Sequence, residues 1–235
     1  MLALSITLLA VLNADAAKKP QTEKLAKNSR NSPVRKTRSL SNPEISEARD
    51  LLFELGYWIN PDVSGKDISL RHALIAFQKI EGRNRTGVLS AEELEALRCA
   101  KRPEVLEHGY PHIEIDLQRQ VLFIVDAPEC DLRILPISSG SGEFFTEGGE
   151  TRQALTPTGR FNIYRKVEGW RKSQLGLLYY PNYIYYGIAI HGNPSVPATP
   201  ASHGCIRIPM FASQGFSKIA TIGMEVIVYD GDPLE

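Results

Sequence analysis

The spacing of hydrophobic side chains changes near the middle of the chain, and this change constrains the fold more than any other feature. Before residue 102, apolar residues recur at the three-to-four-residue spacing of amphipathic helices. From His112 onward they alternate with polar residues, as in Ile113, Ile115 and Leu117. Such alternation is typical of strands with one buried face. The two patterns predict an α+β multidomain chain, with a small helical part followed by a mostly β part.

Three short helices, forming a small bundle, are predicted between residues 44 and 102. Ser41 and Asn42 are suitable capping residues for the first, and Gly56 is a natural helix stop. Ser90 and Glu93 have the spacing of a capping box at the start of the third. The predicted helices cover residues 44–56, 69–80 and 90–98.

Short apolar runs separated by glycine and proline predict the strands of the second part. Few segments there have helical spacing, which favours a mostly β domain. The glycine-rich segment 140–149 is predicted to be a mobile loop near the functional site. The strands are predicted over residues 113–117, 121–125, 134–137, 161–164, 184–190 and 225–229.

The formal net charge is zero, with 27 basic and 27 acidic residues, and this argues against a dedicated nucleic-acid-binding protein. No glycine-rich phosphate loop follows a strand, so we expect no nucleotide cofactor. The charge is unevenly distributed, because residues 18–43 carry a net charge of +7. We interpret this segment as a disordered linker; attraction to an anionic lipid or wall polymer is the alternative.

The apolar run from Leu2 to Leu12, followed by Ala14-Asp15-Ala16, predicts a signal peptide over residues 1–17. An uncleaved anchor is the alternative interpretation. With cleavage, we expect an exported protein of the periplasm or cell wall, with no transmembrane segment in the mature chain. The sequence leaves the oligomeric state unknown.

The residues with the most reactive chemistry lie between 191 and 207. Cys205 follows His203 by two positions and His191 by fourteen, which is compatible with a thiol nucleophile and an imidazole base. Spacing alone leaves two alternatives open. A single cysteine can be a small buried apolar residue, and two histidines with a cysteine can bind zinc.

Three motifs together resemble the L,D-transpeptidase catalytic domain, also called the YkuD domain, over residues 111–230. They are Ser202-His203-Gly204-Cys205-Ile206-Arg207, His191-Gly192 and Thr156-Pro157-Thr158-Gly159-Arg160-Phe161. The resemblance implies a β-sandwich without a metal or other cofactor. It implies that a cysteine thiolate attacks the third residue of a peptidoglycan stem peptide and expels D-alanine. An amine of another stem then takes the acyl group, forming a 3→3 cross-link.

By this resemblance Cys205 is the nucleophile and His191 the general base, with the Gly192 carbonyl orienting the ring. The backbone N–H groups of Gly204 and Cys205 would form the oxyanion hole, and His203 would give electrostatic support or contact the substrate. Substrate binding is assigned to Arg207, Ser202, Asn193 and Tyr185. For Arg207, a structural ion pair is the alternative, and the tyrosines of residues 179–186 are alternatively packing residues.

Residues 44–102 resemble the peptidoglycan-binding type 1 domain through Leu55-Gly56-Tyr57, Ala73-Leu74-Ile75-Ala76-Phe77-Gln78 and Thr86-Gly87-Val88-Leu89. Peptidoglycan stem peptides and glycan are therefore the expected partners. A bundle that only docks on its neighbour is the alternative.

Other functions also fit the sequence. With water as acceptor, the same cysteine would give an L,D-carboxypeptidase or an amidase. A non-catalytic wall-binding protein is a further alternative. In an oxidising compartment Cys205 must stay free, so Cys99 and Cys130 are predicted to form a disulfide.

Overall fold

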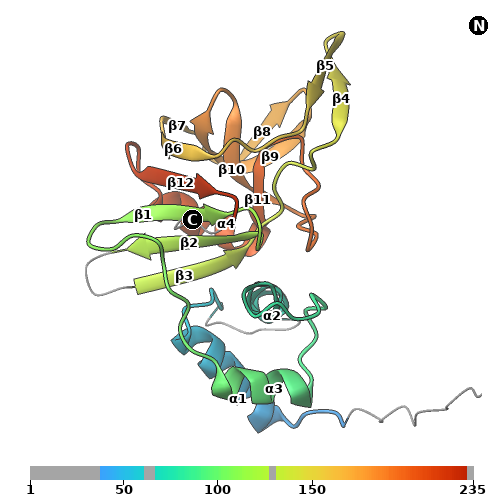
Figure 1. Cartoon of the computed structure of the whole chain (residues 1–235), viewed down its shortest axis with the longest axis vertical. Coiled ribbons are helices and arrows are strands. Elements are labelled where there is room, and N and C mark those ends of the chain that lie inside the picture. Colours follow the sequence, from blue (N-terminus) through green and yellow to red (C-terminus); the bar gives the residue numbers. More distant parts are fainter. Residues whose placement is uncertain (1–37, 61–66, 127–130, 232–235) are drawn as a thin grey trace, which may run out of the picture. The chain divides into compact units, whose positions relative to one another are not determined.

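The computed structural model describes residues 38–60, 67–126 and 131–231 of the chain (Figure 1). The predicted signal peptide, residues 18–37 of the predicted linker, and Cys130 lie outside these residues. The described residues belong to one compact unit. They include no helix with the length and apolar character that a membrane span needs.

The three predicted helices are present as α1 (Asn42–Glu54), α2 (Ile68–Ile80) and α3 (Ala91–Cys99). Ser41 begins α1 in a capping box with Glu44, and the chain leaves the helix through Gly56 at φ +94°. The Ser90 hydroxyl accepts a hydrogen bond from the Glu93 N–H at 3.2 Å. Local capping chemistry therefore set these helix ends as the sequence predicted.

The first sheet has the strand order β3-β2-β1-β12-β6. The pairing of β1 with β12 is parallel, whereas the other neighbours are antiparallel. Its strands are β1 (His112–Asp116), β2 (Val121–Asp126), β3 (Asp131–Pro136), β6 (Gly159–Asn162) and β12 (Glu225–Tyr229).

The second sheet has the order β11-β10-β9-β7, with β8 also paired to β9. The pair β10 and β11 is parallel. A separate hairpin, β4 and β5, projects beside this sheet (Figure 1). These elements are β4 (Phe144–Glu147), β5 (Glu150–Gln153), β7 (Arg165–Lys166), β8 (Trp170–Ser173), β9 (Gly176–Tyr185), β10 (Ile188–Asn193), β11 (Ile206–Pro209) and the helix α4 (Met210–Ile219).

Strand β2 is apolar from Val121 to Val125 because both of its faces are covered there. Val121 and Phe123 pack in the core that the first sheet shares with α1, α2 and α3. Leu122 and Ile124 point the other way, into a core that includes residues of the second sheet and α4. A strand buried on both faces has no polar alternation. The predicted α+β class is confirmed.

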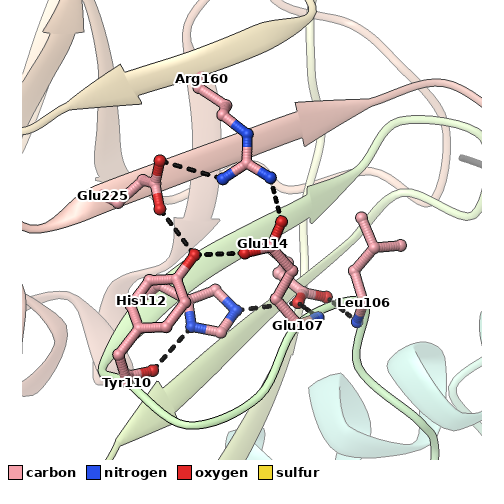
Figure 2. A network of polar contacts seen from close by, with 7 residues as sticks. All are labelled: Leu106, Glu107, Tyr110, His112, Glu114, Arg160 and Glu225. Carbon is pink, nitrogen blue, oxygen red and sulfur yellow. Dashed lines mark hydrogen bonds and ion pairs between the residues drawn. The ribbon is translucent and has the colours of Figure 1, made fainter.

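The chain between α3 and β1 is held against the first sheet by a buried polar network (Figure 2). The Glu114 carboxylate accepts hydrogen bonds from the N–H groups of Leu106 and Glu107, each at 2.9 Å. The His112 ring lies between two acceptors, with Nε2 2.9 Å from Glu114 and Nδ1 2.8 Å from the Tyr110 carbonyl. Against the effect of burial, the Glu114 carboxylate and the Tyr110 carbonyl raise the pKa of His112, which favours its imidazolium form.

Three predictions of local structure were wrong. The strand predicted over 184–190 is the end of β9 and the start of β10, because the chain reverses at Tyr186 (φ +29°) and Gly187 (φ +89°). The loop predicted over 140–149 contains β4 and turns into β5 at Gly148 and Gly149. Helix α4 was missed, although its buried residues Ala212 and Phe216 have helical spacing.

Candidate active site

The parallel pair β10 and β11 puts the predicted catalytic residues on one face of the second sheet. His191 is opposite Arg207, and Ile190 is opposite Ile206. The isoleucines point into the core between the sheets. Because side chains alternate along a strand, His191 and Arg207 point to the other face. Cys205 immediately precedes β11 and packs on that face against Ala189, Leu178 and Tyr183.

The His191 ring is held in one orientation by the backbone. Its Nδ1 lies 2.9 Å from the Gly192 carbonyl oxygen, and the side chain is 4% exposed. A carbonyl oxygen can only accept, so Nδ1 carries the proton and the neutral ring has its lone pair on Nε2. This is the tautomer that a general base needs.

Cys205 is presented by a tight turn. Gly204 has φ +127°, and a Cβ there would lie 2.9 Å from the Leu155 carbonyl oxygen, so only glycine fits. The Ser202 hydroxyl donates to the Cys205 carbonyl at 2.5 Å and accepts from the Gly204 N–H at 3.0 Å. Thr156 adds a hydrogen bond to the Gly204 carbonyl at 2.7 Å. The turn is therefore fixed from both sides.

The electrostatics of the site favour an uncharged thiol and imidazole. Burial lowers the pKa of His191 to about 4, despite the opposing hydrogen bond to Gly192. Burial likewise raises the pKa of the Cys205 thiol, against a backbone hydrogen bond from Ala189 and the charge of Arg207. At neutral pH the free protein therefore contains a neutral thiol and a neutral imidazole, so a thiolate could form only if a base such as the imidazole took its proton.

His191, Cys205 and Arg207 line one pocket of about 540 Å³. Residues of the β4–β5 hairpin and of the β8–β9 hairpin form much of the remaining wall. His203 also lines the pocket; it is exposed, and its ring packs on Phe145 of β4 with a centroid distance of 4.7 Å. A peptide-sized substrate can therefore reach the thiol between the two hairpins.

Arg207 lies directly opposite His191 in the β10–β11 pair, and its positive charge lowers the pKa of both His191 and Cys205. Its backbone is bonded to Ser138 in both directions, at 3.0 and 3.1 Å. The Arg207 guanidinium has no ion pair or side-chain hydrogen bond among residues 38–60, 67–126 and 131–231. The structure thus leaves its fork available to a ligand.

Other predicted residues take different places. Asn193 and Ser202 line the pocket, but the Asn193 side chain accepts the Ser195 N–H at 2.8 Å, and Ser202 is 2% exposed. Tyr185 lies outside the pocket, where its ring packs on Phe161 at 5.3 Å. Of the tyrosines between residues 179 and 186, Tyr183 and Tyr186 line the pocket. The alternating sequence pattern could not predict this, because the β9–β10 turn was not recognised.

Sequence reasoning gave no role to several groups of the site. Thr156 is part of the motif that carried the resemblance, yet its hydrogen bonds to Gly140 and Gly204 appear only in the fold. Ala189 acts through its backbone, which no side-chain pattern reveals. Cys99 is an exposed free thiol, and because Cys130 is not described, the Cys99–Cys130 disulfide stays a prediction. Within the described part of the chain, no three His, Cys, Asp or Glu side chains group as metal ligands would.

Comparisons with known proteins identify the family of the chain. The family model described as "YkuD: L,D-transpeptidase catalytic domain" matches residues 110–228. A search of curated proteins finds no match. Among solved structures, the L,D-transpeptidase (residues 123–326) of Xylanimonas cellulosilytica is 34% identical, with a TM-score of 0.74, covering 82% of this chain and 96% of that chain.

Two further structures are more distant. The L,D-transpeptidase (Yku) of Stackebrandtia nassauensis is 18% identical, with a TM-score of 0.47 and coverage of 84% of this chain and 95% of that one. The L,D-transpeptidase 1 of Mycobacterium tuberculosis is 20% identical, with a TM-score of 0.39, 52% of this chain and 62% of that chain being covered. The family model and the Xylanimonas structure establish that the chain belongs to the L,D-transpeptidase family with a YkuD catalytic domain.

Proposed function

We propose that this protein is a cell-wall L,D-transpeptidase in which the Cys205 thiol forms an acyl-enzyme with a peptidoglycan tetrapeptide stem. One observation carries the proposal: Cys205, His191 and Arg207 lie on one face of the β10–β11 pair and line the same pocket. A nucleophile, an oriented base and an unpaired cation are what acyl transfer from a carboxylate-bearing peptide needs.

In the first half-reaction, Cys205 Sγ attacks the carbonyl carbon between the third stem residue and the terminal D-alanine. His191 Nε2 takes the thiol proton as the C–S bond forms, and then gives it to the amine of the leaving D-alanine when the C–N bond breaks. A thioester remains. In the second half-reaction, the side-chain amine of another stem attacks the thioester carbonyl and His191 takes its proton. His191 passes this proton to Sγ as the C–S bond breaks, which releases the cross-linked product and restores the thiol and the neutral imidazole.

The neighbours of Cys205 determine how the developing oxyanion is held. The Gly204 N–H donates to Ser202 Oγ at 3.0 Å instead of pointing freely into the pocket. We therefore assign the oxyanion to the Cys205 N–H, with Ser202 holding the turn and not the substrate. The Arg207 guanidinium would bind a stem-peptide carboxylate, and His203 and Asn193 would contact the peptide at the pocket wall.

The remaining proposals concern the setting of the reaction. Residues 44–102 would bind peptidoglycan glycan, as the resemblance to the peptidoglycan-binding type 1 domain implies. Residues 1–17 would direct export to the periplasm or cell wall. The signal peptide is tested with a tagged full chain, which should be exported, and with a variant that lacks residues 2–12, which should not. Glycan binding is tested by co-sedimentation of residues 38–235 with purified peptidoglycan.

The direct test of the chemistry is incubation of the full chain with disaccharide-tetrapeptide, followed by mass spectrometry of the products. We expect loss of D-alanine together with cross-linked dimers, and a covalent carbapenem adduct on Cys205. Cys205→Ala should abolish both. Cys99→Ser is the matched control, because it removes an exposed thiol that lies outside the pocket. Assayed under reducing conditions, in which the predicted Cys99–Cys130 disulfide is open in wild type and variant alike, it should leave activity unchanged.

The outcomes separate the alternatives. Loss of D-alanine without dimers would identify a hydrolytic L,D-carboxypeptidase that uses the same acyl-enzyme. Unchanged turnover in Cys205→Ala would refute the cysteine mechanism. No turnover and no carbapenem adduct in the wild type would favour a non-catalytic wall-binding protein.

A further inference from the structure

Lys79, near the end of α2, is buried although its charge has no partner of opposite sign. The side chain is 2% exposed. Its Nζ donates to two main-chain carbonyls of the β domain, Gln120 at 2.9 Å and Ile137 at 2.8 Å. Among the described residues it forms no ion pair with a carboxylate. Burying an amine in this way is costly, so the bonds it makes need an explanation.

The two bonds of Lys79 persist on both sides of neutrality. Burial, together with the smaller effect of the Arg85 charge, lowers the pKa of Lys79 to about 7. Both the ammonium and the neutral amine carry at least two N–H groups. Either form can therefore donate to both carbonyls, and Lys79 serves as a fixed two-pronged donor between α2 and the β domain.

The first of these carbonyls belongs to an unusual turn residue. Gln120 has φ +62°, a conformation that non-glycine residues seldom adopt, and it is 1% exposed. Its side-chain Nε2 donates to Ser139 Oγ at 2.7 Å, and its Oε1 accepts the Ser139 N–H at 2.9 Å. Its carbonyl also accepts the Ile137 N–H at 2.9 Å. Holding Gln120 therefore holds Ser139.

Ser139 in turn anchors the segment that carries the nucleophile. Its carbonyl accepts the N–H of Ala201 at 3.0 Å and the N–H of Ser202 at 2.9 Å. The Ser202 hydroxyl donates to the Cys205 carbonyl. A continuous series of hydrogen bonds therefore runs from Lys79 in the helical part through Gln120 and Ser139 to the turn that presents Cys205.

The helical part contacts the same segment at a second point. Arg85, in the chain between α2 and α3, donates through Nη1 to the Ala198 carbonyl at 3.1 Å. Ala198 lies between β10 and β11 and so belongs to the connection between His191 and Cys205. Two independent donors of the helical part thus reach main-chain groups that support this connection.

We propose that Lys79 is a positioning residue for the reaction of Cys205: by fixing Gln120 and, through it, Ser139, it sets the conformation of the 201–205 turn and the aim of the Cys205 N–H. The helical part is then a structural component of the active site, in addition to any glycan that it binds. This inference rests on the proposed acyl-enzyme chemistry of Cys205.

The test compares two reactions of the same thiol in the full chain carrying Lys79→Met. This change keeps an unbranched side chain, one atom shorter, and removes its donors. Acylation by a carbapenem needs the oxyanion donor, whereas alkylation by iodoacetamide needs only an accessible sulfur. We expect the acylation rate constant to fall at least about tenfold, because small misplacements of an oxyanion donor are costly. Alkylation of the Cys205 peptide should stay within about twofold of wild type, and kcat should fall with KM unchanged.

Phe77→Leu is the matched control, since Phe77 lies on the same helix, is fully buried in the helical core and makes none of these hydrogen bonds. It should lower the melting temperature while leaving acylation within about twofold. Gln120→Leu interrupts the series below Lys79, so it serves as the second variant if Lys79→Met does not fold. The double variant should be acylated no more slowly than the slower of the two single variants, because both changes act on one series of hydrogen bonds.

Each outcome has a defined meaning. If the acylation rate constants of Lys79→Met and Gln120→Leu are both within about twofold of the wild-type value, the inference is overturned and the cysteine chemistry is unaffected. Equal losses in Phe77→Leu and Lys79→Met would also overturn it, since general destabilisation would then be the cause. A wild-type protein that is not acylated would refute the proposed function, and the inference with it.

Discussion

Gly192 links the orientation of His191, the proposed general base, to the packing of α4, and replacing Gly192 with alanine gives a sharp test of that link. A Cβ at this position would lie 2.1 Å from Ser213 Oγ and 2.8 Å from Ser213 Cβ. The backbone there is not left-handed, so the effect of Gly192→Ala is purely steric. The Ser213 hydroxyl cannot rotate away freely, because it donates to the Pro209 carbonyl at 2.9 Å.

The expected magnitude follows from these contacts. Overpacking of a well-packed core costs about 1–3 kcal/mol, and an approach as close as 2.1 Å belongs at the upper end. Ser213→Gly alone should cost about 1–2 kcal/mol through the lost hydrogen bond and the lower helix propensity. In the double variant the nearest remaining atom to the new methyl is Tyr179 Cδ1, at 3.1 Å. We therefore expect it to be more stable than the sum of the single effects by about 2 kcal/mol.

The assay is urea unfolding followed by the fluorescence of Trp58 and Trp170, with the slope m compared between variants. Ser217→Gly is the control, because it removes a hydroxyl from the same helix without touching Gly192. Combined with Gly192→Ala it should be additive. If the unfolding free energies of Gly192→Ala and Ser213→Gly also add to within about 0.5 kcal/mol, the steric argument is refuted.

Three further predictions concern charge. Since burial lowers the pKa of His191 to about 4, the acid limb of kcat/KM should lie near pH 4, and an inflection near the ordinary histidine value of about 6.5 would contradict a buried neutral base. Arg207→Gln should raise KM at least about tenfold while changing the unfolding free energy by less than about 1 kcal/mol; a larger loss of stability would indicate a structural ion pair. Glu114→Gln should cost about 3–5 kcal/mol because it leaves the buried His112 imidazolium unpaired. The pKa of His112 is raised, so its contribution is complete below about pH 6.5 and is lost as the pH rises through the higher folded value; urea titrations at several pH values should show this slope in the wild type and not in the variant.

Several features of this protein follow from short stretches of sequence. The helix ends depend on contacts within a few residues, such as Ser41 with Glu44 and Ser90 with Glu93, and local chemistry predicts these. The α+β class follows from the change in apolar spacing. Cys205 and His191 are recognisable from their motifs, and the family comparisons confirm the family that the motifs indicated.

Other features depend on which segments become neighbours, and this information is distributed over the whole chain. Residues 184–190 have strand-like spacing throughout, yet the chain reverses at Tyr186 and Gly187. The β9–β10 pairing also shifts register between Tyr183 and Tyr185, and Tyr183 lines the pocket whereas Tyr185 does not. The Arg207 fork is available because none of the described carboxylates forms an ion pair with it, which no motif encodes.

The sequence by itself determined the reactive groups and the class of fold, because both depend on residue type and local spacing. Only the tertiary structure decided how those groups work together. The parallel register of β10 and β11 sets His191 beside Arg207, and burial makes the imidazole and the thiol neutral. Long-range hydrogen bonds connect Lys79, 126 positions before Cys205, to the turn that presents the thiol. Desolvation and long-range pairing arise from packing, so they exist only in the folded chain.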